Sequence, residues 1–350
     1  MDRIDISNEL KEIANILQKE QESQIKQRLL TSNLRAHASN LRLDNICRYA
    51  RDVAFLTKTS QRNNSNGKEK LILLKTAGKH ESIIENKRHE LAQGNTLVHL
   101  KSNSICTWIP KIACSTLRYS IALDNGAISG FNDFSWIHQN NTTFVANNKE
   151  LLNSSYAFVI LRNPFKKLLS FYLDKICSDK STKEDQSYAF AKGIFNTHNS
   201  TTFEEFVNTI YEDPHLISKD IHTRRQCDFL IYANYSDYFK FEDFEGTKKR
   251  LKEKIGLELV DTRQRGSIRT THEMDELKEF DHRTTVSEAN SFLDMHKKPL
   301  TTNMYTPEMI AKVGTIYFSD ILLYRNTVNG GAEELEDWMN TLRSLDLSDE

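Results

Sequence analysis

Short apolar runs, each followed directly by a helix-compatible segment, limit the fold of this chain more than any other feature. They lie at Ser104 to Ile109, Tyr156 to Leu161, Phe229 to Tyr232 and Tyr238 to Phe241. Runs of this length rich in β-branched and aromatic residues predict strands, and their continuous apolarity predicts strands buried on both faces. Helices that alternate with such strands cover a parallel sheet. The sequence therefore predicts an α/β protein of three layers, with a central, mainly parallel sheet flanked by helices.

The first part of the chain has a different pattern. From Ile6 to about Leu56 it is rich in Glu, Lys, Gln and Leu and contains neither Pro nor Gly, which predicts one or two amphipathic helices. A polar run from Thr57 to Lys70 is typical of a linker. We expect a helical N-terminal extension over residues 1–93, a main domain over residues 94–330 and an acidic helix or tail over residues 331–350. The N-terminal helices could pack on the main domain or form a homo-oligomer.

Charge and composition exclude several classes of protein. Lys and Arg (47) balance Asp and Glu (48), so no global positive field favours nucleic acid. No run approaches the roughly 20 apolar residues of a membrane span, and Met1 begins a polar segment without the apolar core of a signal peptide. The five cysteines are odd in number and lack CxxC spacing, which favours neither a disulfide framework nor a zinc site. We expect a soluble protein of the cytoplasm.

The loop after the first predicted strand has the composition of an anion site. It runs from Pro110 to Thr116 with the sequence PKIACST, and a helix-compatible stretch follows. Small residues let the backbone approach an anion, and the amides of a first helical turn are unsatisfied donors that point out of the helix. Ser115 and Thr116 add hydroxyl donors, and Lys111 adds a mobile positive charge. The alternative is an ordinary strand-to-helix turn with a solvated lysine.

A second loop combines a strand end with a well-defined helix start. The strand Tyr156 to Leu161 ends at Arg162, and Asn163 and Pro164 are favoured N-cap and first helical residues. Arg162 is thus expected at the carboxyl end of a strand, where a guanidinium can grip a phosphate through two donors. Ser170, two turns into the helix, could share that anion. The alternative is a strand-end arginine paired with a carboxylate.

Together the two loops resemble the PAPS-dependent sulfotransferase superfamily, most closely its carbohydrate (Golgi-type) and related bacterial branch. In that family a Pro-Lys-x-Ala/Gly-x-Ser/Thr loop binds the 5'-phosphosulfate of 3'-phosphoadenosine 5'-phosphosulfate (PAPS), and a later Arg-x-Pro segment binds its 3'-phosphate. The run from Pro110 to Thr116 matches the first loop. The second is matched by Arg162, Pro164, Ser170 and Tyr172. The resemblance covers about Ser104 to Asn326 and implies a P-loop-like fold, PAPS as cofactor, its desulfated form as product, and no metal.

Weaker matches extend the resemblance toward the C-terminus. The stretch from Asp220 to Leu230 looks like a His-x-x-Pro-Gln-x-x-x-Leu motif with Arg225 in place of Pro, and Phe239 replaces the Gly of a Gly-Lys/Arg-Phe-Glu strand. The run from His282 to Thr285 resembles a basic, hydroxyl-rich loop that closes over the cofactor. The cofactor-binding residues that the resemblance implies are Lys111, Ile112, Ala113, Cys114, Ser115, Thr116, Arg162, Ser170, Arg283 and Thr284.

The resemblance also implies the reaction, which is transfer of a sulfuryl group to a hydroxyl, and the family branch implies a carbohydrate acceptor. Like phosphoryl transfer, it is an in-line displacement that depends on positioning and electrostatics. Lys111 would stabilise the leaving phosphate oxygen, and a histidine would act as general base near neutral pH. Two histidines compete for this role. His138 lies in the interval where several family branches keep their catalytic histidine and is preferred to His222.

Two other functions compete with sulfuryl transfer. A P-loop-type small-molecule kinase would need a glycine-rich triphosphate loop and a magnesium carboxylate, and the sequence offers neither. A catalytically inactive protein that binds a nucleotide is the second, and Lys111, Arg162 and Ser170 argue against it. The acceptor is not identified by any residue pattern. We expect its pocket near Ser178 to Ser187 and Thr197 to Thr202.

Overall fold

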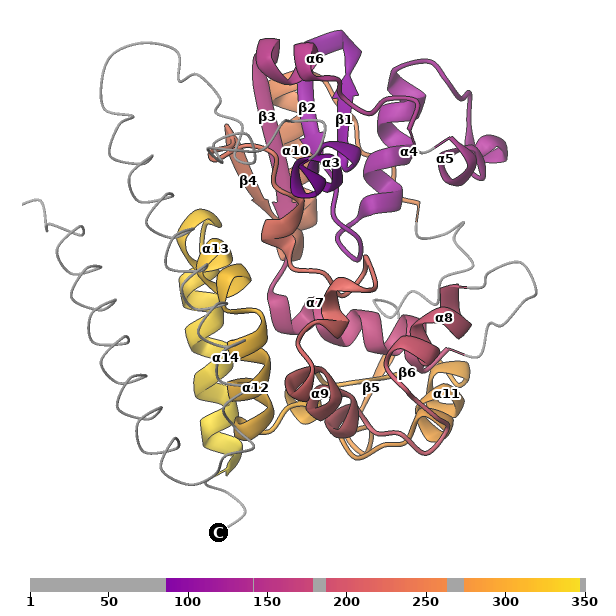
Figure 1. The fold of residues 1–350 in the computed structure, drawn as a ribbon, viewed down its shortest axis with the longest axis vertical. Coiled ribbons are helices and arrows are strands. Elements are labelled where there is room, and N and C mark those ends of the chain that lie inside the picture. Colours follow the sequence, from indigo (N-terminus) through magenta and orange to yellow (C-terminus); the bar gives the residue numbers. More distant parts are fainter. Residues whose placement is uncertain (1–85, 141, 179–186, 263–273, 347–350) are drawn as a thin grey trace, which may run out of the picture. The chain divides into compact units, whose positions relative to one another are not determined.

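The computed structural model describes residues 86–140, 142–178, 187–262 and 274–346 (Figure 1). Contacts divide the chain into two units, Met1–Glu69 and Lys70–Glu350, and all described residues belong to the second. The predicted N-terminal helices and the linker lie outside the described residues, so they stay predictions.

A four-stranded sheet forms the centre of the described part. Its strands, in spatial order, are β1 (Thr96–His99), β2 (Ser104–Thr107), β3 (Tyr156–Leu161) and β4 (Asp237–Lys240). β1 and β2 form an antiparallel hairpin, whereas β2, β3 and β4 run parallel. A sheet dominated by parallel strands confirms the predicted α/β class.

Burial of the strands explains their apolar sequences. Every residue of β1 and β2 is buried, as are five of the six residues of β3. In Figure 1, α10 (Phe244–Ile255) lies behind the sheet and α3 (Lys87–Gly94) lies in front of it. Strands covered on both faces have no polar side to present to water, so their sequences do not alternate.

Two helices leave the carboxyl ends of the parallel strands. α4 (Cys114–Asp124) follows β2, and α7 (Pro164–Phe171) follows β3. The start of α7 is the predicted one, because the Asn163 side chain accepts a hydrogen bond from the Phe165 amide at 3.0 Å and Pro164 is the first helical residue. α7 continues into a π-helical turn, Tyr172–Ile176.

The remaining elements surround this centre. The other described helices are α5 (Trp136–Gln139), α6 (Asn148–Asn153), α8 (Ser187–Ile194), α9 (Phe203–Glu212), α11 (Val286–Asp294), α12 (Pro307–Ile316), α13 (Phe318–Thr327) and α14 (Gly331–Asp346). A capping box starts each of α6, α9 and α11: the side chain of the cap residue and that of a glutamate three positions later each accept the other's backbone amide. A two-stranded parallel sheet pairs β5 (Asp275–Leu277) with β6 (Lys297–Pro299). Among the described residues, each helix is too short or too polar to cross a lipid bilayer.

The predicted strand at Phe229 to Tyr232 is wrong. A 3-10 turn, Gln226–Phe229, occupies its start, and the following residues are irregular apart from one bridge residue. The Asp320 carboxylate accepts the amides of Gln226 and Cys227 at 2.7 and 3.0 Å, which stabilises the turn. The run is nevertheless buried throughout, so its apolarity could not distinguish a strand from a buried turn.

Candidate active site

The loops that follow β2 and β3 meet at the carboxyl ends of these strands. The Arg162 guanidinium donates a hydrogen bond from Nη1 to the backbone oxygen of Lys111 at 3.0 Å. This contact joins a residue of the first loop to a residue of the second across 51 positions of sequence. The structure thus brings into contact the two loops that carry the predicted cationic residues, Lys111 and Arg162.

The first loop has a strained backbone. Lys111 and Ala113 adopt left-handed conformations with φ of 68° and 48°. Residues other than glycine rarely occupy this region, and they do so mainly where surrounding contacts hold them, often at functional sites. Here Ile112 between them is fully buried and donates its amide to Ile109 at 3.2 Å, while Arg162 holds the Lys111 carbonyl. The loop conformation is therefore fixed by its neighbours.

This conformation leaves the start of α4 without a side-chain cap. Ala113 is the N-cap residue and has no side-chain oxygen that could accept the amides of the first turn. Cys114 and Ser115, the first helical residues, are half-buried. An uncapped helix start offers its amide donors to an anion. Thr116 differs, because its buried hydroxyl is hydrogen-bonded to the Thr262 hydroxyl at 2.9 Å.

The ammonium group of Lys111 is paired with the carboxylate of Asp174, a residue that no sequence motif indicated. Lys111 Nζ lies 2.7 Å from Asp174 Oδ2, and the two side chains are only 12% and 18% exposed. Asp174 belongs to the π-helical turn after α7. Burial alone would raise the pKa of this carboxyl, but the Lys111 ammonium, together with Lys175 and His222, holds the pKa below its ordinary value. Asp174 is therefore a carboxylate at neutral pH.

Arg162 is half-buried, and its guanidinium is incompletely satisfied. Its guanidinium lies over the Phe241 ring, 4.6 Å from the ring centroid, and its Nε is buried without a hydrogen-bond partner among the described residues. Burial lowers the pKa of Arg162, and the nearby Glu242 opposes this effect. A buried donor without a partner costs free energy, so the site fits an anionic ligand that would accept from this guanidinium.

The backbone of Arg162 is held on both sides by one side chain. Its amide donates to Gln226 Oε1 at 3.0 Å, and Gln226 Nε2 donates to its carbonyl at 2.8 Å. Gln226 is itself anchored, because the buried Asp320 carboxylate accepts its amide. In the sequence, Gln226 is only one position of a weakly matching motif. Its contacts in the structure identify it as the residue that fixes the end of β3.

His222 lies close to this arrangement. Its Nδ1 is 2.8 Å from Asp220 Oδ1, its ring lies nearly parallel to Phe171, and its charge helps to lower the pKa of Asp174. The buried ammonium of Lys167 donates to the carbonyl oxygens of His222 and Arg224 at 2.9 and 2.8 Å. Burial lowers the pKa of Lys167 to about 8. Lys167 thus fixes the segment that carries His222.

His138 has a different setting. It is exposed on the short helix α5, where its ring meets the edge of Phe134 at 5.8 Å. In Figure 1, α5 lies on the side of α4 away from the sheet. A guanidinium nitrogen of Arg118 in α4 donates to the backbone oxygen of Ile137 and ties the two helices together.

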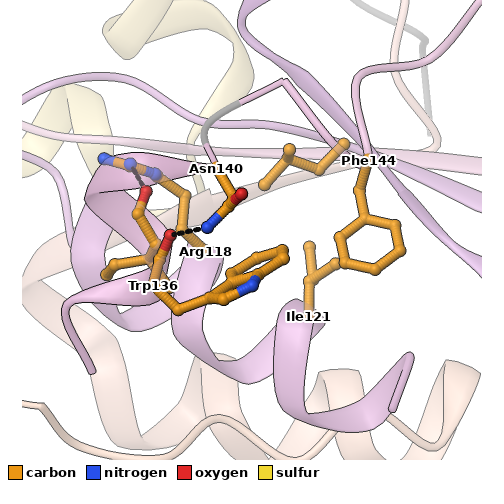
Figure 2. Close-up of a pocket in the computed structure, with 7 residues that line it drawn as sticks. Arg118, Ile121, Trp136, Asn140 and Phe144 are labelled. Atoms are coloured by element: carbon orange, nitrogen blue, oxygen red, sulfur yellow. Dashed lines mark hydrogen bonds between the residues drawn. The ribbon is translucent and has the colours of Figure 1, made fainter. Parts of the chain in front are cut away.

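A small pocket separates α4 from α5 (Figure 2). Its walls are Leu97, Arg118, Ile121, Trp136, Ile137, Asn140 and Phe144. Its cavity volume of about 10 Å³ is about that of a single water site and far below the roughly 300 to 1,000 Å³ of typical ligand pockets. Trp136 packs on Phe144 with ring centroids 6.1 Å apart, so its indole contributes to packing here.

The other predicted residues are more scattered. Ser170 is half-buried in α7. Arg283 is mainly exposed and pairs with Asp281 at 2.6 Å, and the buried Thr284 hydroxyl accepts the Asp281 amide at 3.0 Å. Both precede α11, and within the described part of the chain no hydrogen bond or ion pair links Arg283 to the two loops.

The two departures from the motifs have local explanations. Arg225 has φ −60° and ψ 143°, a conformation that proline also adopts, so the substitution leaves the backbone path unchanged. Phe239, in place of glycine, is fully buried and meets the Phe158 ring at 5.9 Å.

Comparison with known proteins gives one result. A family model described as "Sulfotransferase family" matches residues 95–325 of the 350, which include the whole sheet and both loops. No curated protein and no solved structure matches the chain. Within the described ranges, no group of three or more His, Cys, Asp or Glu side chains could hold a metal ion.

Proposed function

The chain belongs to the sulfotransferase family, and from this premise we propose that it transfers a sulfuryl group from PAPS to a hydroxyl of a carbohydrate. The observation that supports PAPS most directly is the hydrogen bond between Arg162 and the Lys111 carbonyl. This bond holds the Arg162 guanidinium, at the end of β3, against the loop after β2 that carries the Lys111 ammonium. A nucleotide with an anionic group on each side of its ribose matches two such cationic positions.

The residues present fit this nucleotide. The uncapped start of α4 and the Lys111 ammonium suit the 5'-phosphosulfate, and the unsatisfied guanidinium of Arg162 suits the 3'-phosphate. When bound, PAPS supplies an activated sulfuryl group on a phosphate leaving group. Lys111 stabilises the charge on the leaving oxygen.

A histidine is proposed to remove the proton of the acceptor hydroxyl. His222 has the better support, because Asp220 orients its ring through Nδ1 and leaves Nε2 to accept the proton. The neighbouring carboxylates stabilise the imidazolium that forms. His138 stays the second candidate and is exposed on the short helix α5.

The carbohydrate acceptor is a proposal that rests on the resemblance to the carbohydrate branch. The surroundings of His222 are compatible with it. Charged side chains surround this ring, because His222 and Lys175 both help to lower the pKa values of the Asp174 and Asp220 carboxyls. Donors and acceptors of this kind recognise a polyhydroxyl molecule better than an apolar one.

Proposals also cover the rest of the chain. We infer a helical extension over residues 1–93, a sulfotransferase domain over residues 94–330 and a C-terminal element over residues 331–350, of which α14 is the described part. A cytoplasmic location and a homo-oligomer formed through the N-terminal helices complete the proposal.

Isothermal titration with adenosine 3',5'-bisphosphate tests the cofactor assignment. Lys111→Ala and Arg162→Ala should each weaken binding by about 10- to 100-fold, the effect of losing a hydrogen bond to a charged group. Lys101→Ala, a mainly exposed lysine of the β1–β2 hairpin, is the control and should bind like the wild type. ATP titrated in parallel should bind more weakly. Native affinity in both site variants would refute the assignment, and turnover with labelled PAPS then separates an active enzyme from an inactive one.

A further inference from the structure

The ion pair between Lys111 and Asp174 places a negative charge inside a site built for anions. The two charged atoms are 2.7 Å apart, and Asp174 is mostly shielded from water. Ion pairs on an open surface contribute little, but shielding from solvent strengthens the attraction. A bound anion must therefore compete with Asp174 for the Lys111 ammonium.

The position of Asp174 is set by an unusual piece of backbone. The turn Tyr172–Ile176 is π-helical, and the Cys177 amide donates to the Tyr172 carbonyl at 2.9 Å across its five-residue step. π-helical turns are rare and often occur at functional sites, since the extra residue changes which side chain faces a neighbouring element. Tyr172, Leu173 and Ile176 are buried and anchor the turn, so Asp174 is held toward Lys111 by packing.

A second group borders Asp174. The charge of His222 is one of the influences that lower the pKa of the Asp174 carboxyl, so the two side chains lie within electrostatic reach. Phe171, three residues before Asp174, lies against the His222 ring with centroids 6.4 Å apart. Asp174 thus contacts the cation proposed for the leaving oxygen and lies near the histidine proposed as base. Lys175, the neighbouring cation of the turn, lies over the Tyr188 ring at 4.0 Å.

We propose that Asp174 is a positioning residue that holds the Lys111 ammonium while no anion is bound, yields it to the phosphosulfate, and then stabilises His222 in its protonated form. The inference rests on the proposed function. During transfer the acceptor oxygen forms a bond to sulfur as the bond from sulfur to the phosphate oxygen breaks. The acceptor proton moves to His222, and the leaving phosphate keeps the electron pair beside Lys111.

Asp174→Asn separates this role from a purely structural one. The variant removes both the competition for Lys111 and the repulsion of the ligand, so it should bind adenosine 3',5'-bisphosphate about 10-fold more tightly. Its turnover with PAPS should fall by about 10-fold or more, because a protonated His222 loses a neighbouring negative charge. Tighter binding combined with slower turnover is a result that loss of structure does not produce.

The control variants are matched in charge and in geometry. Glu253→Gln removes one negative charge from the exposed face of α10 and should leave both affinity and turnover unchanged. Asp174→Glu keeps the carboxylate and should restore affinity to within about threefold of the wild type. Asp174→Ser removes the charge with a smaller side chain, and it replaces Asp174→Asn if that variant does not fold.

The outcomes are distinguishable. Unchanged or weaker binding of the bisphosphate by the uncharged Asp174 variants, with the wild type binding it, would overturn the role of Asp174 and leave the proposed function intact. Absence of bisphosphate binding by the wild type would instead overturn the proposed function.

Discussion

Glu334 provides the sharpest test of how the C-terminal helix supports the site. It lies on α14, beyond the residues that the family model matches, and it ties α14 to the ends of β3 and β4. Its carboxylate is 2.8 Å from Lys166 Nζ and 2.7 Å from Lys240 Nζ, and it accepts hydrogen bonds from the Tyr324 hydroxyl and the Asn163 amide group. Burial alone would raise the pKa of Glu334, but these partners lower it to about 2.

The free energy follows from this pKa. A fall from 4.5 to about 2 corresponds to about 3 kcal/mol of folding free energy. The folded-state pKa is depressed, so this contribution is complete above pH 4.5 and is lost as the pH falls toward 2. About half of it should remain at pH 3. Glu334→Gln should therefore be about 3 kcal/mol less stable than the wild type at pH 7, with the difference about halved at pH 3.

Urea unfolding followed by tryptophan fluorescence measures this difference. Trp338 is one turn beyond Glu334 and packs on the Phe165 ring at 4.3 Å, so its emission reports the docking of α14. Glu333→Gln removes an exposed carboxylate from the same helix and is the control, which should cost less than about 0.5 kcal/mol. A stability difference for Glu334→Gln that is the same at pH 7 and pH 3 would refute the reasoning.

Two further predictions concern the site itself. His222→Ala should lower turnover by ~10²-fold or more with bisphosphate affinity retained, while His138→Ala should change turnover by less than about threefold. Steady-state rates at saturating PAPS measure both effects. The opposite pattern would assign the base to His138. Gln226→Ala should weaken bisphosphate binding by about 10-fold and lower the melting temperature. It removes two hydrogen bonds to the Arg162 backbone, whose amide and carbonyl groups would lose these partners. Titration calorimetry together with a thermal melt tests this, and native affinity would show that β3 holds Arg162 without Gln226.

Much of the fold could be predicted from the sequence where one local signal decides the structure. The strand Tyr156–Leu161 has the predicted bounds, and Asn163 caps the helix that follows. β4 is displaced by one residue from its predicted range. The strand β1 was not predicted because its sequence, TLVH, has only two apolar residues in succession, between polar ones. The strand predicted at Phe229 to Tyr232 was wrong because the conformation of this run depends on Asp320, which is remote in sequence.

The site could be predicted only for residues that stand in recognisable loops. Lys111 and Arg162 stand in loops of recognisable composition at strand ends, and in the structure these loops are in contact. Asp174 lies 63 positions from Lys111, and nothing in the sequence indicates which carboxylate pairs with this lysine. Lys167 and Gln226 act through backbone atoms of distant segments, contacts that leave no mark on a sequence pattern.

The left-handed backbone at Lys111 restricts what could ever replace it. A β-branched side chain would clash in that conformation, whereas glycine would occupy it with less strain and asparagine is among the residues that tolerate it. Folding by itself therefore gives no reason to choose a long, charged side chain at this position. In a library of variants selected only for stability, lysine would be displaced by smaller residues, and its retention in a library selected for activity would measure how much the reaction depends on that one ammonium.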